Sequence, residues 1–241
     1  MKANLDQQRA VLELAHIDAT LAKLDHQIST LPEIGELKEL TISANGSRDL
    51  RIAAETELKD VQRELSRAEG DVEQIVSRIE RDEKRLNSGQ GAPKELEQLQ
   101  HELGTLAQRR KELEEIELEI MLRIDDIKVR INALSSEEAA FQQKIADTQV
   151  RKENSLTALS KEHEISQSDR TRVITGISAE LLAIYEKARA DRGVGAAALV
   201  GGKCTGCNLT INAVELNRIK SLPEDDVVRC EECRCILVRA Q

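Results

Sequence analysis

The stretches Cys204-Thr205-Gly206-Cys207 and Cys230-Glu231-Glu232-Cys233 decide how the C-terminal part of the chain folds. Two Cys-x-x-Cys pairs at this separation are typical of a zinc site in which four thiolates form a tetrahedron. The segment that they enclose is too short to be stable on its own hydrophobic core, so the metal would contribute much of its folding free energy. We therefore predict that residues 193–241 form a small β zinc ribbon.

The predicted ligands Cys204, Cys207, Cys230 and Cys233 would hold one structural Zn²⁺ per chain. A redox pair is the alternative for a single Cys-x-x-Cys, but two pairs flanked by strand and turn signals favour the metal. Four cysteines leave no open position for water or substrate, so catalytic zinc is not expected. Cys235 has the wrong spacing for the tetrahedron. We expect it to be a strand residue, with a substitute ligand or a redox thiol as the alternatives.

Short regular elements are predicted around the cysteines. The residue after each pair often adopts the left-handed conformation, which suits Asn208 and strains Arg234 by about 1 kcal/mol. Asn212 is a suitable N-cap for a short helix. The predicted elements are a strand over residues 196–200, a helix over residues 213–220, and a β-hairpin formed by residues 227–229 and 236–238.

The rest of the chain has the composition of long helices with a narrow apolar core. Of its 241 residues 33% are charged, and Phe141 and Tyr185 are the only aromatic residues. A compact domain of this length normally uses more rings, whereas Leu, Ile and Val here recur with a spacing of three and four. This periodicity is typical of coiled-coil seams and excludes a disordered chain. The seams run over residues 14–31, 58–86 and 96–159.

A turn is predicted at residues 87–93, which contain two glycines and a proline suited to the first position of a helix. If the chain reverses there, facing seam residues have numbers that sum to about 182, so that Leu58 meets Ile124. The two seams agree with this register, which predicts a long antiparallel coiled-coil hairpin over residues 1–192. The tip of this hairpin comprises Asn87, Gly89, Gly91, Pro93 and Lys94.

Several positions interrupt the regular pattern. Pro32 and the stretch 45–47 predict a kink or break at about residues 32–47. Arg110 and Glu117 lie in the seam, where their stems can pack while their charges reach water, or where they can fix the register; we favour the first reading. Residues 173–188 carry a broader apolar stripe, which indicates packing against the N-terminal segment and the ribbon.

The charge of the chain and its lack of recognisable targeting segments and catalytic motifs restrict the classes of function that we expect. The net charge is −9, while the ribbon has six basic and six acidic residues, so the helical part is acidic and poorly suited to binding duplex DNA along its length. No signal peptide or membrane span is recognisable, and the cysteine usage fits a reducing cytoplasm. The sequence contains no phosphate-binding glycine loop and no nucleophile motif, so we expect neither an enzyme nor a small-molecule substrate. A basic patch for RNA or DNA is a candidate, formed by Lys203, Arg218, Lys220, Arg229, Arg234 and Arg239.

The chain resembles a bacterial family of four-cysteine zinc-ribbon proteins with an N-terminal antiparallel coiled-coil hairpin. The likeness is carried by residues 93–103, which follow the predicted turn, and by residues 185–189, 201–207 and 230–237. At the second cysteine pair the chain departs from the family pattern, with Glu231 for Pro, Arg234 for Gly, Cys235 for Arg and Val238 for Tyr. The resemblance implies a non-enzymatic adaptor or regulator, associated in different members with transcription factors, RNA or secretion machinery.

The sequence thus predicts a mainly α protein whose hairpin and ribbon bind protein partners. A regulator that binds RNA or DNA through the ribbon is the alternative, although the ribbon has a balanced charge and no aromatic residues for base stacking. A thiol redox enzyme is a third reading.

Overall fold

The computed structural model describes residues 1–239. Contacts within the chain define two compact units. The first contains Met1–Ile34 and the chain from Val150 onward, and the second contains Gly35–Gln149. The elements are α1 (Leu5–Ser29), α2 (Pro32–Asn87), α3 (Pro93–Ile174), α4 (Ala179–Arg192), β1 (Ala196–Val200), β2 (Lys203–Cys204), α5 (Ala213–Ser221), β3 (Val228–Arg229) and β4 (Ile236–Arg239). The mainly α fold with a small C-terminal sheet is confirmed.

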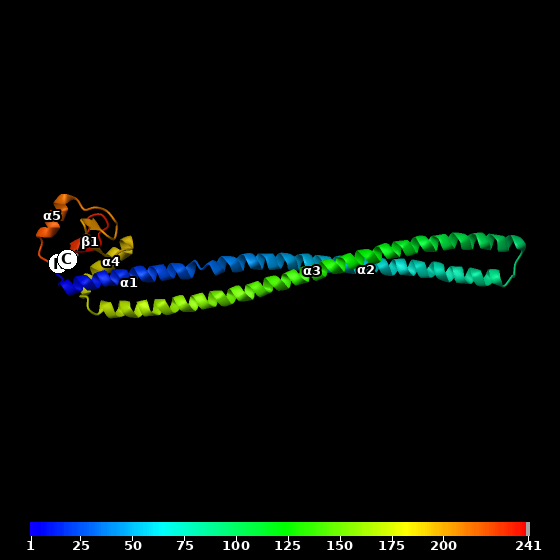
Figure 1. Cartoon of the computed structure of the whole chain (residues 1–241), viewed down its shortest axis with the longest axis horizontal. Helices are drawn as coiled ribbons and strands as arrows, with labels where there is room; N and C mark the ends of the chain where they lie inside the picture. The colour runs from blue at the N-terminus through cyan, green and yellow to red at the C-terminus, as the bar shows by residue number, and fades with distance from the viewer. Residues whose placement is uncertain (240–241) are drawn as a thin grey trace. The chain divides into compact units, whose positions relative to one another are not determined.

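The second unit is an antiparallel pair formed by α2 from Gly35 onward and by α3 up to Gln149, which join through a short turn after Asn87 (Figure 1). Its core is the predicted seam, where Val61 and Ala68 of α2 pack with Ile120, Ile124 and Ile127 of α3. Ion pairs between α2 and α3 lie beside the apolar seam. They join Arg51 to Glu138, Glu57 to Arg130, Glu64 to Arg123 and Arg78 to Glu102.

The seam register agrees with the prediction. Leu58 belongs to the same apolar cluster as Ile124, its predicted partner. Arg110 is exposed and pairs with Glu114 of its own helix at 3.2 Å, whereas Glu117 is half-buried. Arg110 therefore follows the reading in which a seam residue carries its charge out to water.

The predicted interruption at residues 32–47 is only partly correct. The helix ends at Ser29 and restarts at Pro32, so the break lies just before the proline, which takes the first position of α2. Residues 45–47, predicted as a second interruption, are helical. Ala44 and Ser47 are buried on either side of Gly46, and this packing outweighs the helix penalty of glycine, roughly 1 kcal/mol.

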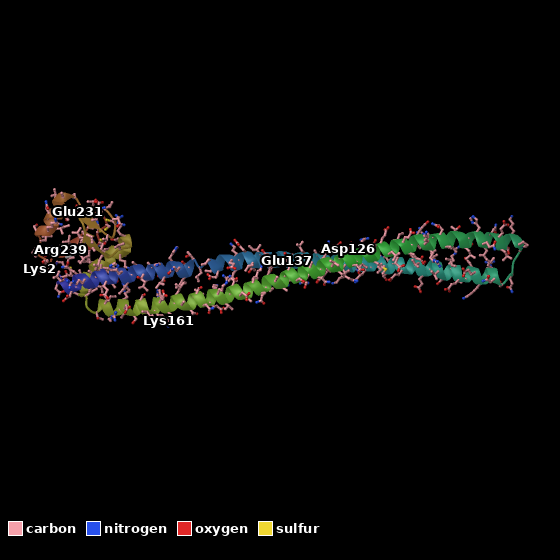
Figure 2. The ribbon with its side chains drawn as sticks, in the orientation of Figure 1. Lys2, Asp126, Glu137, Lys161, Glu231 and Arg239 are labelled. Atoms are coloured by element: carbon pink, nitrogen blue, oxygen red, sulfur yellow. The ribbon has the colours of Figure 1, made fainter. Side chains whose placement is uncertain are left out.

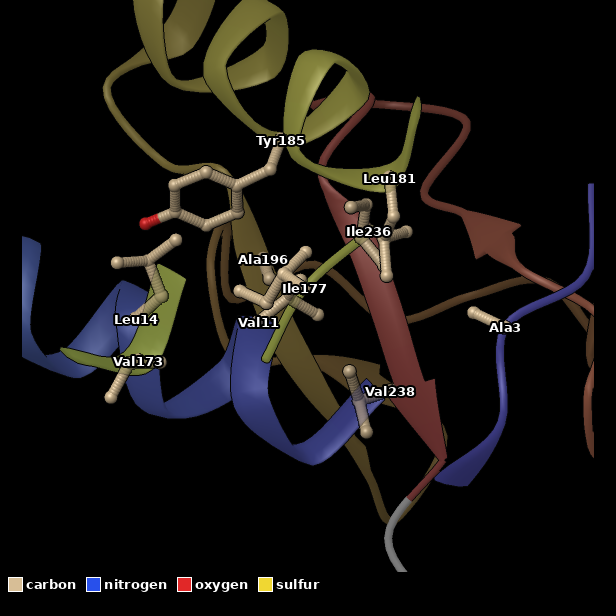
Figure 3. Packing of buried hydrophobic residues seen from close by; sticks show 10 residues of the cluster. All are labelled: Ala3, Val11, Leu14, Val173, Ile177, Leu181, Tyr185, Ala196, Ile236 and Val238. Carbon is tan, nitrogen blue, oxygen red and sulfur yellow. The ribbon is translucent and has the colours of Figure 1, made fainter. Parts of the chain in front are cut away.

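In the first unit, one of two apolar clusters joins the helices to the ribbon (Figure 3). Val11 and Leu14 of α1 face Leu181 and Tyr185 of α4, and Ile236 of β4 completes the core. The broad stripe predicted at residues 173–188 thus packs against both the N-terminal helix and the ribbon, as expected. The predicted domain boundary at residue 193 stays a prediction, because the helices on one side of it share a core with the strands on the other.

The ribbon contains a four-stranded sheet with the order β2-β1-β4-β3. β1 and β4 are parallel neighbours at its centre, and the outer strands are antiparallel to them. The predicted strand over 196–200, the hairpin of β3 and β4, and the helix α5 are all present. The Asn212 side chain accepts a hydrogen bond from the Glu215 amide and caps α5, as predicted.

The first residues of the chain pair with the ribbon, which the sequence did not predict. The Ala3 amide donates to the Asp225 carbonyl at 2.7 Å, and the Val227 amide donates to the Met1 carbonyl at 3.1 Å. The Gln8 side-chain amide of α1 donates to the Glu224 carbonyl at 2.7 Å. These bonds fasten the N-terminal segment along the chain that leads into β3.

Side chains project outward from both long helices, as Asp126 and Glu137 do on α3 (Figure 2). Within residues 1–239, no helix combines the length and the apolar character needed to cross a bilayer.

Candidate metal centre

The four predicted ligands lie on two matching turns. Cys204 ends β2, and its carbonyl accepts the Asn208 amide at 2.8 Å; Cys230 follows β3, and its carbonyl accepts the Arg234 amide at 2.9 Å. Asn208 and Arg234 both have positive φ, 61° and 62°, as predicted. Each turn folds its Cys-x-x-Cys pair back on itself, so both sulfurs of a pair face the same point.

The four sulfurs converge. The Sγ atoms of Cys204, Cys207, Cys230 and Cys233 all lie within 4.8 Å of one another. Across the two turns, Cys204 and Cys233 are 3.8 Å apart, and Cys207 and Cys230 are 3.9 Å apart. Thiolates at about 2.3 Å from a zinc ion form a tetrahedron with edges of about 3.8 Å. The donor set therefore fits tetrahedral zinc in both chemistry and size.

The surroundings of the sulfurs are apolar. Ala197, Ile219, Val228 and Leu237 pack around them. Burial raises the pKa of the Cys233 thiol to about 12, so the protein alone disfavours the thiolate. A divalent cation at the centre would reverse this preference, because it stabilises the deprotonated sulfur.

Gly206, inside the first turn, lies in a closely packed position. A Cβ atom at this position would lie 3.0 Å from the Cβ atom of Ala197 and 3.2 Å from a methyl group of Val194. A larger residue at this position would therefore require Ala197 and Val194 to shift by a few tenths of an ångström. This packing ties the first cysteine pair to the central strand of the sheet.

A fifth sulfur lies beside the four. Cys235 immediately precedes β4 and is fully buried, and its carbonyl accepts the Cys230 amide at 3.0 Å. Its Sγ atom is 3.3 Å from that of Cys233 and 3.7 Å from that of Cys204. The expectation of an ordinary strand residue is thus incomplete, because the side chain is directed at the metal centre.

The basic residues proposed as nucleic-acid contacts have different environments. The Arg239 guanidinium has a structural role, because it donates hydrogen bonds to five backbone carbonyl groups of the ribbon. These belong to residues 219, 222, 223, 224 and 226. Arg218 forms an ion pair with Glu215, and Arg229 donates to the Arg234 carbonyl at 3.0 Å. The side chains of Arg218 and Arg229 are nevertheless exposed, as are those of Lys203, Lys220 and Arg234.

The predicted tip residues all lie at the turn between the long helices. Asn87 ends α2, Pro93 begins α3, and Gly89 has the positive φ of 65° that its place in the turn requires. Gly91 and Lys94 are exposed like the rest of the turn. The Glu95 carboxylate accepts the Ala92 amide at 3.2 Å and so caps α3.

A buried polar cluster in the first unit was not predicted. Asp18 of α1 is 6% exposed and accepts hydrogen bonds from Tyr185 Oη and Arg170 Nε, both at 2.7 Å. Arg189 Nε lies 3.2 Å from the same carboxylate, and Arg170 also pairs with Glu186. Burial raises the pKa of Tyr185, so the phenol stays a donor. The cluster joins α1, α3 and α4. The one sequence signal for it was the chain's single tyrosine.

Comparison with known proteins finds a matching family for each part of this architecture. Residues 14–193 match the family described as a CT398-like coiled coil hairpin domain, and residues 203–237 match a C4-type zinc ribbon domain. An uncharacterized protein of Mycobacterium tuberculosis is 34% identical, in an alignment that covers 100% of this chain and 98% of the relative.

Two solved structures show the same fold. One from Mycobacterium smegmatis is 32% identical over 100% of both chains, with a TM-score of 0.86. CT398 from Chlamydia trachomatis is 17% identical over 98% of both chains, with a TM-score of 0.69, a likeness of fold alone. The chain belongs to the CT398-like coiled-coil hairpin family, and it ends in a C4-type zinc ribbon.

Proposed function

We propose that this protein is a non-enzymatic adaptor in which four cysteines hold one structural Zn²⁺ and the hairpin and ribbon bind protein partners. The observation that carries the proposal is the convergence of Cys204, Cys207, Cys230 and Cys233 to within 4.8 Å. Four thiolates close the coordination sphere, so such a centre supplies folding energy rather than a site for substrate.

The metal would hold the two cysteine turns together, while the chain's own residues fix the ribbon to the helices. β1 and β4 carry Ala196 and Ile236 into the core that contains Leu14 and Tyr185. Removing the metal would therefore loosen the surface that the ribbon presents to a partner. The free thiols fit a reducing compartment, and a cytoplasmic location stays a prediction.

Apolar side chains on the outer face of α3 support a protein partner for the hairpin. Leu118, Leu122 and Val129 are 59%, 68% and 68% exposed, and Met121 lies beside them. Their spacing places them on one helix face, away from the seam that contains Ile120, Ile124 and Ile127. Apolar groups that recur at helical spacing and stay in water suit the apolar face of a partner helix.

The proposal is tested by affinity capture with the full-length chain, followed by rebinding of each purified, identified partner. Three variants are compared with the parent: Cys204→Ser/Cys207→Ser, Leu118→Gln/Leu122→Gln/Val129→Gln, and the control Asp126→Gln/Glu137→Gln on exposed polar positions of α3. We expect at least one protein to rebind to the parent and the control but not to one of the first two variants. A chain that rebinds no protein, or binds equally in all four forms, would contradict the adaptor proposal.

RNA or DNA binding through the ribbon stays the alternative, favoured by the exposed side chains of Lys203, Lys220 and Arg234. Phosphate contacts release counterions, so nucleic-acid affinity should fall steeply with salt and weaken in Lys203→Gln and Lys220→Gln variants. Binding that is absent or insensitive to salt would exclude this alternative.

A further inference from the structure

The metal centre contains one more sulfur than a tetrahedron needs. The Cys235 side chain is fully buried. Within residues 1–239 its sulfur accepts a hydrogen bond from the Cys233 thiol and shares another with the Cys204 sulfur, in which either atom can donate. Its backbone is fixed by the hydrogen bond from Cys230 and by the start of β4. The fifth sulfur is therefore a built part of the centre.

One of its distances, that to Cys204, matches the distance between two ligands, although the four sulfurs that converge within 4.8 Å do not include Cys235. The 3.7 Å between Cys235 and Cys204 equals, within 0.1 Å, the 3.8 Å between Cys233 and Cys204. Both values correspond to the edge of a zinc tetrahedron, about 3.8 Å. Cys233 and Cys235, however, are only 3.3 Å apart, less than such an edge. The two sulfurs are therefore too close together to occupy two vertices of one tetrahedron at the same time.

The exchange needs little movement. A change between staggered rotamers carries a cysteine Sγ atom by about 3 Å, which is the size of the gap between Cys235 and Cys233. The two residues also differ in access to solvent, because Cys233 is half-buried whereas Cys235 is fully buried. Cys233 is thus the ligand that solvent-borne electrophiles reach more easily, and Cys235 is the protected one.

We propose that Cys235 is a reserve metal ligand that takes the vertex of Cys233 when Cys233 is modified or absent. The proposal rests on the structural zinc site proposed above. In the exchange, the Cys235 thiol gives its proton to solvent and its sulfur binds the metal, while the Cys233 sulfur leaves with a proton or a modifying group. No electrons are transferred, and the charge of the centre is unchanged.

The test uses the purified full-length chain with Co²⁺ as the probe, because the intensity of its thiolate charge-transfer bands reports the number of bound sulfurs. The variants are Cys233→Ser, Cys235→Ser, Cys233→Ser/Cys235→Ser and Cys207→Ser. Cys207 is the control, since its sulfur contacts Cys230 on the other edge of the centre. Bound Zn²⁺ per chain is measured in parallel.

We expect four-thiolate spectra and one metal per chain for the parent, Cys235→Ser and Cys233→Ser. Cys207→Ser and the double variant should give three-thiolate spectra and bind metal at least tenfold more weakly. In Cys233→Ser, iodoacetamide should modify Cys235 only after a chelator is added. A three-thiolate spectrum for Cys233→Ser, or free alkylation of Cys235 in its metal-loaded form, would overturn the proposal. A parent that binds no metal would instead overturn the zinc site on which it rests.

Discussion

Replacement of Asp18 by asparagine tests how much the buried polar cluster between α1, α3 and α4 contributes to stability. The carboxylate accepts hydrogen bonds from Tyr185 Oη and Arg170 Nε and has Arg189 Nε within 3.2 Å, whereas an amide has a single acceptor oxygen. The amide nitrogen would then face at least one of these donors. Breaking a buried ion pair on one side costs about 3–5 kcal/mol. Arg170 keeps Glu186, so we expect the lower end, about 3 kcal/mol.

The assay is urea unfolding followed by tyrosine fluorescence, because Tyr185 is the only tyrosine and the chain has no tryptophan. A loss of about 3 kcal/mol lowers the urea midpoint by about 1–2 M. The control Asp25→Asn lies on the same helix, where the side chain is 68% exposed and pairs with His163, and it should cost less than about 1 kcal/mol. If Asp18→Asn unfolds at the same urea concentration as this control, the cluster does not stabilise the first unit as argued.

Four further predictions concern the ribbon and its contacts. Gly195→Ala places a Cβ atom 2.4 Å from a Tyr185 ring carbon, so it should lower the free energy of unfolding by about 1–3 kcal/mol; an unchanged urea midpoint would contradict this packing. A chelator that removes bound metal should alter Tyr185 fluorescence, because β1 and β4 pack in the same core, while most of the helical circular dichroism persists; simultaneous loss of both signals would show that the hairpin depends on the metal. Arg239→Lys cannot reach all five carbonyl groups and should cost the ribbon about 1–3 kcal/mol without changing any affinity for RNA; weaker RNA binding in a folded variant would reassign this side chain. A hydrogen bond to Asp225 raises the pKa of Lys2 above its ordinary 10.5, so the stability from this contact is complete below pH 10.5 and is lost as the pH rises through the raised pKa. An NMR titration should find a lower Lys2 pKa in Asp225→Asn than in the parent, and an equal value would show that the contact is absent in solution.

The hairpin and the zinc ribbon were predictable because both depend on the spacing of residues that lie close together in the sequence. A seam residue such as Leu58 recurs with the period of the helix, and the turn after Asn87 fixes the residue it meets on α3. The cysteine pairs likewise need only their own turns to bring the sulfurs together. The helix through Gly46 was missed, because the penalty of a single glycine is smaller than the packing of its neighbours Ala44 and Ser47.

Contacts between distant residues carried no such signal. Asp18 and Tyr185 are 167 positions apart, and nothing in the spacing of α1 distinguishes a buried aspartate from the many solvated ones. Arg239 shows a contact that composition could not reveal: the sequence made it a candidate for a nucleic-acid contact, and that role stays a prediction. In the fold its two terminal nitrogens, Nη1 and Nη2, donate to five carbonyl groups that the turn from Ile219 to Asp226 leaves without strand partners. An arginine beside an irregular, partly buried loop is therefore better assigned by first counting the carbonyl groups within its reach. Only an arginine that has no such carbonyl groups within reach is a candidate for contacting a ligand.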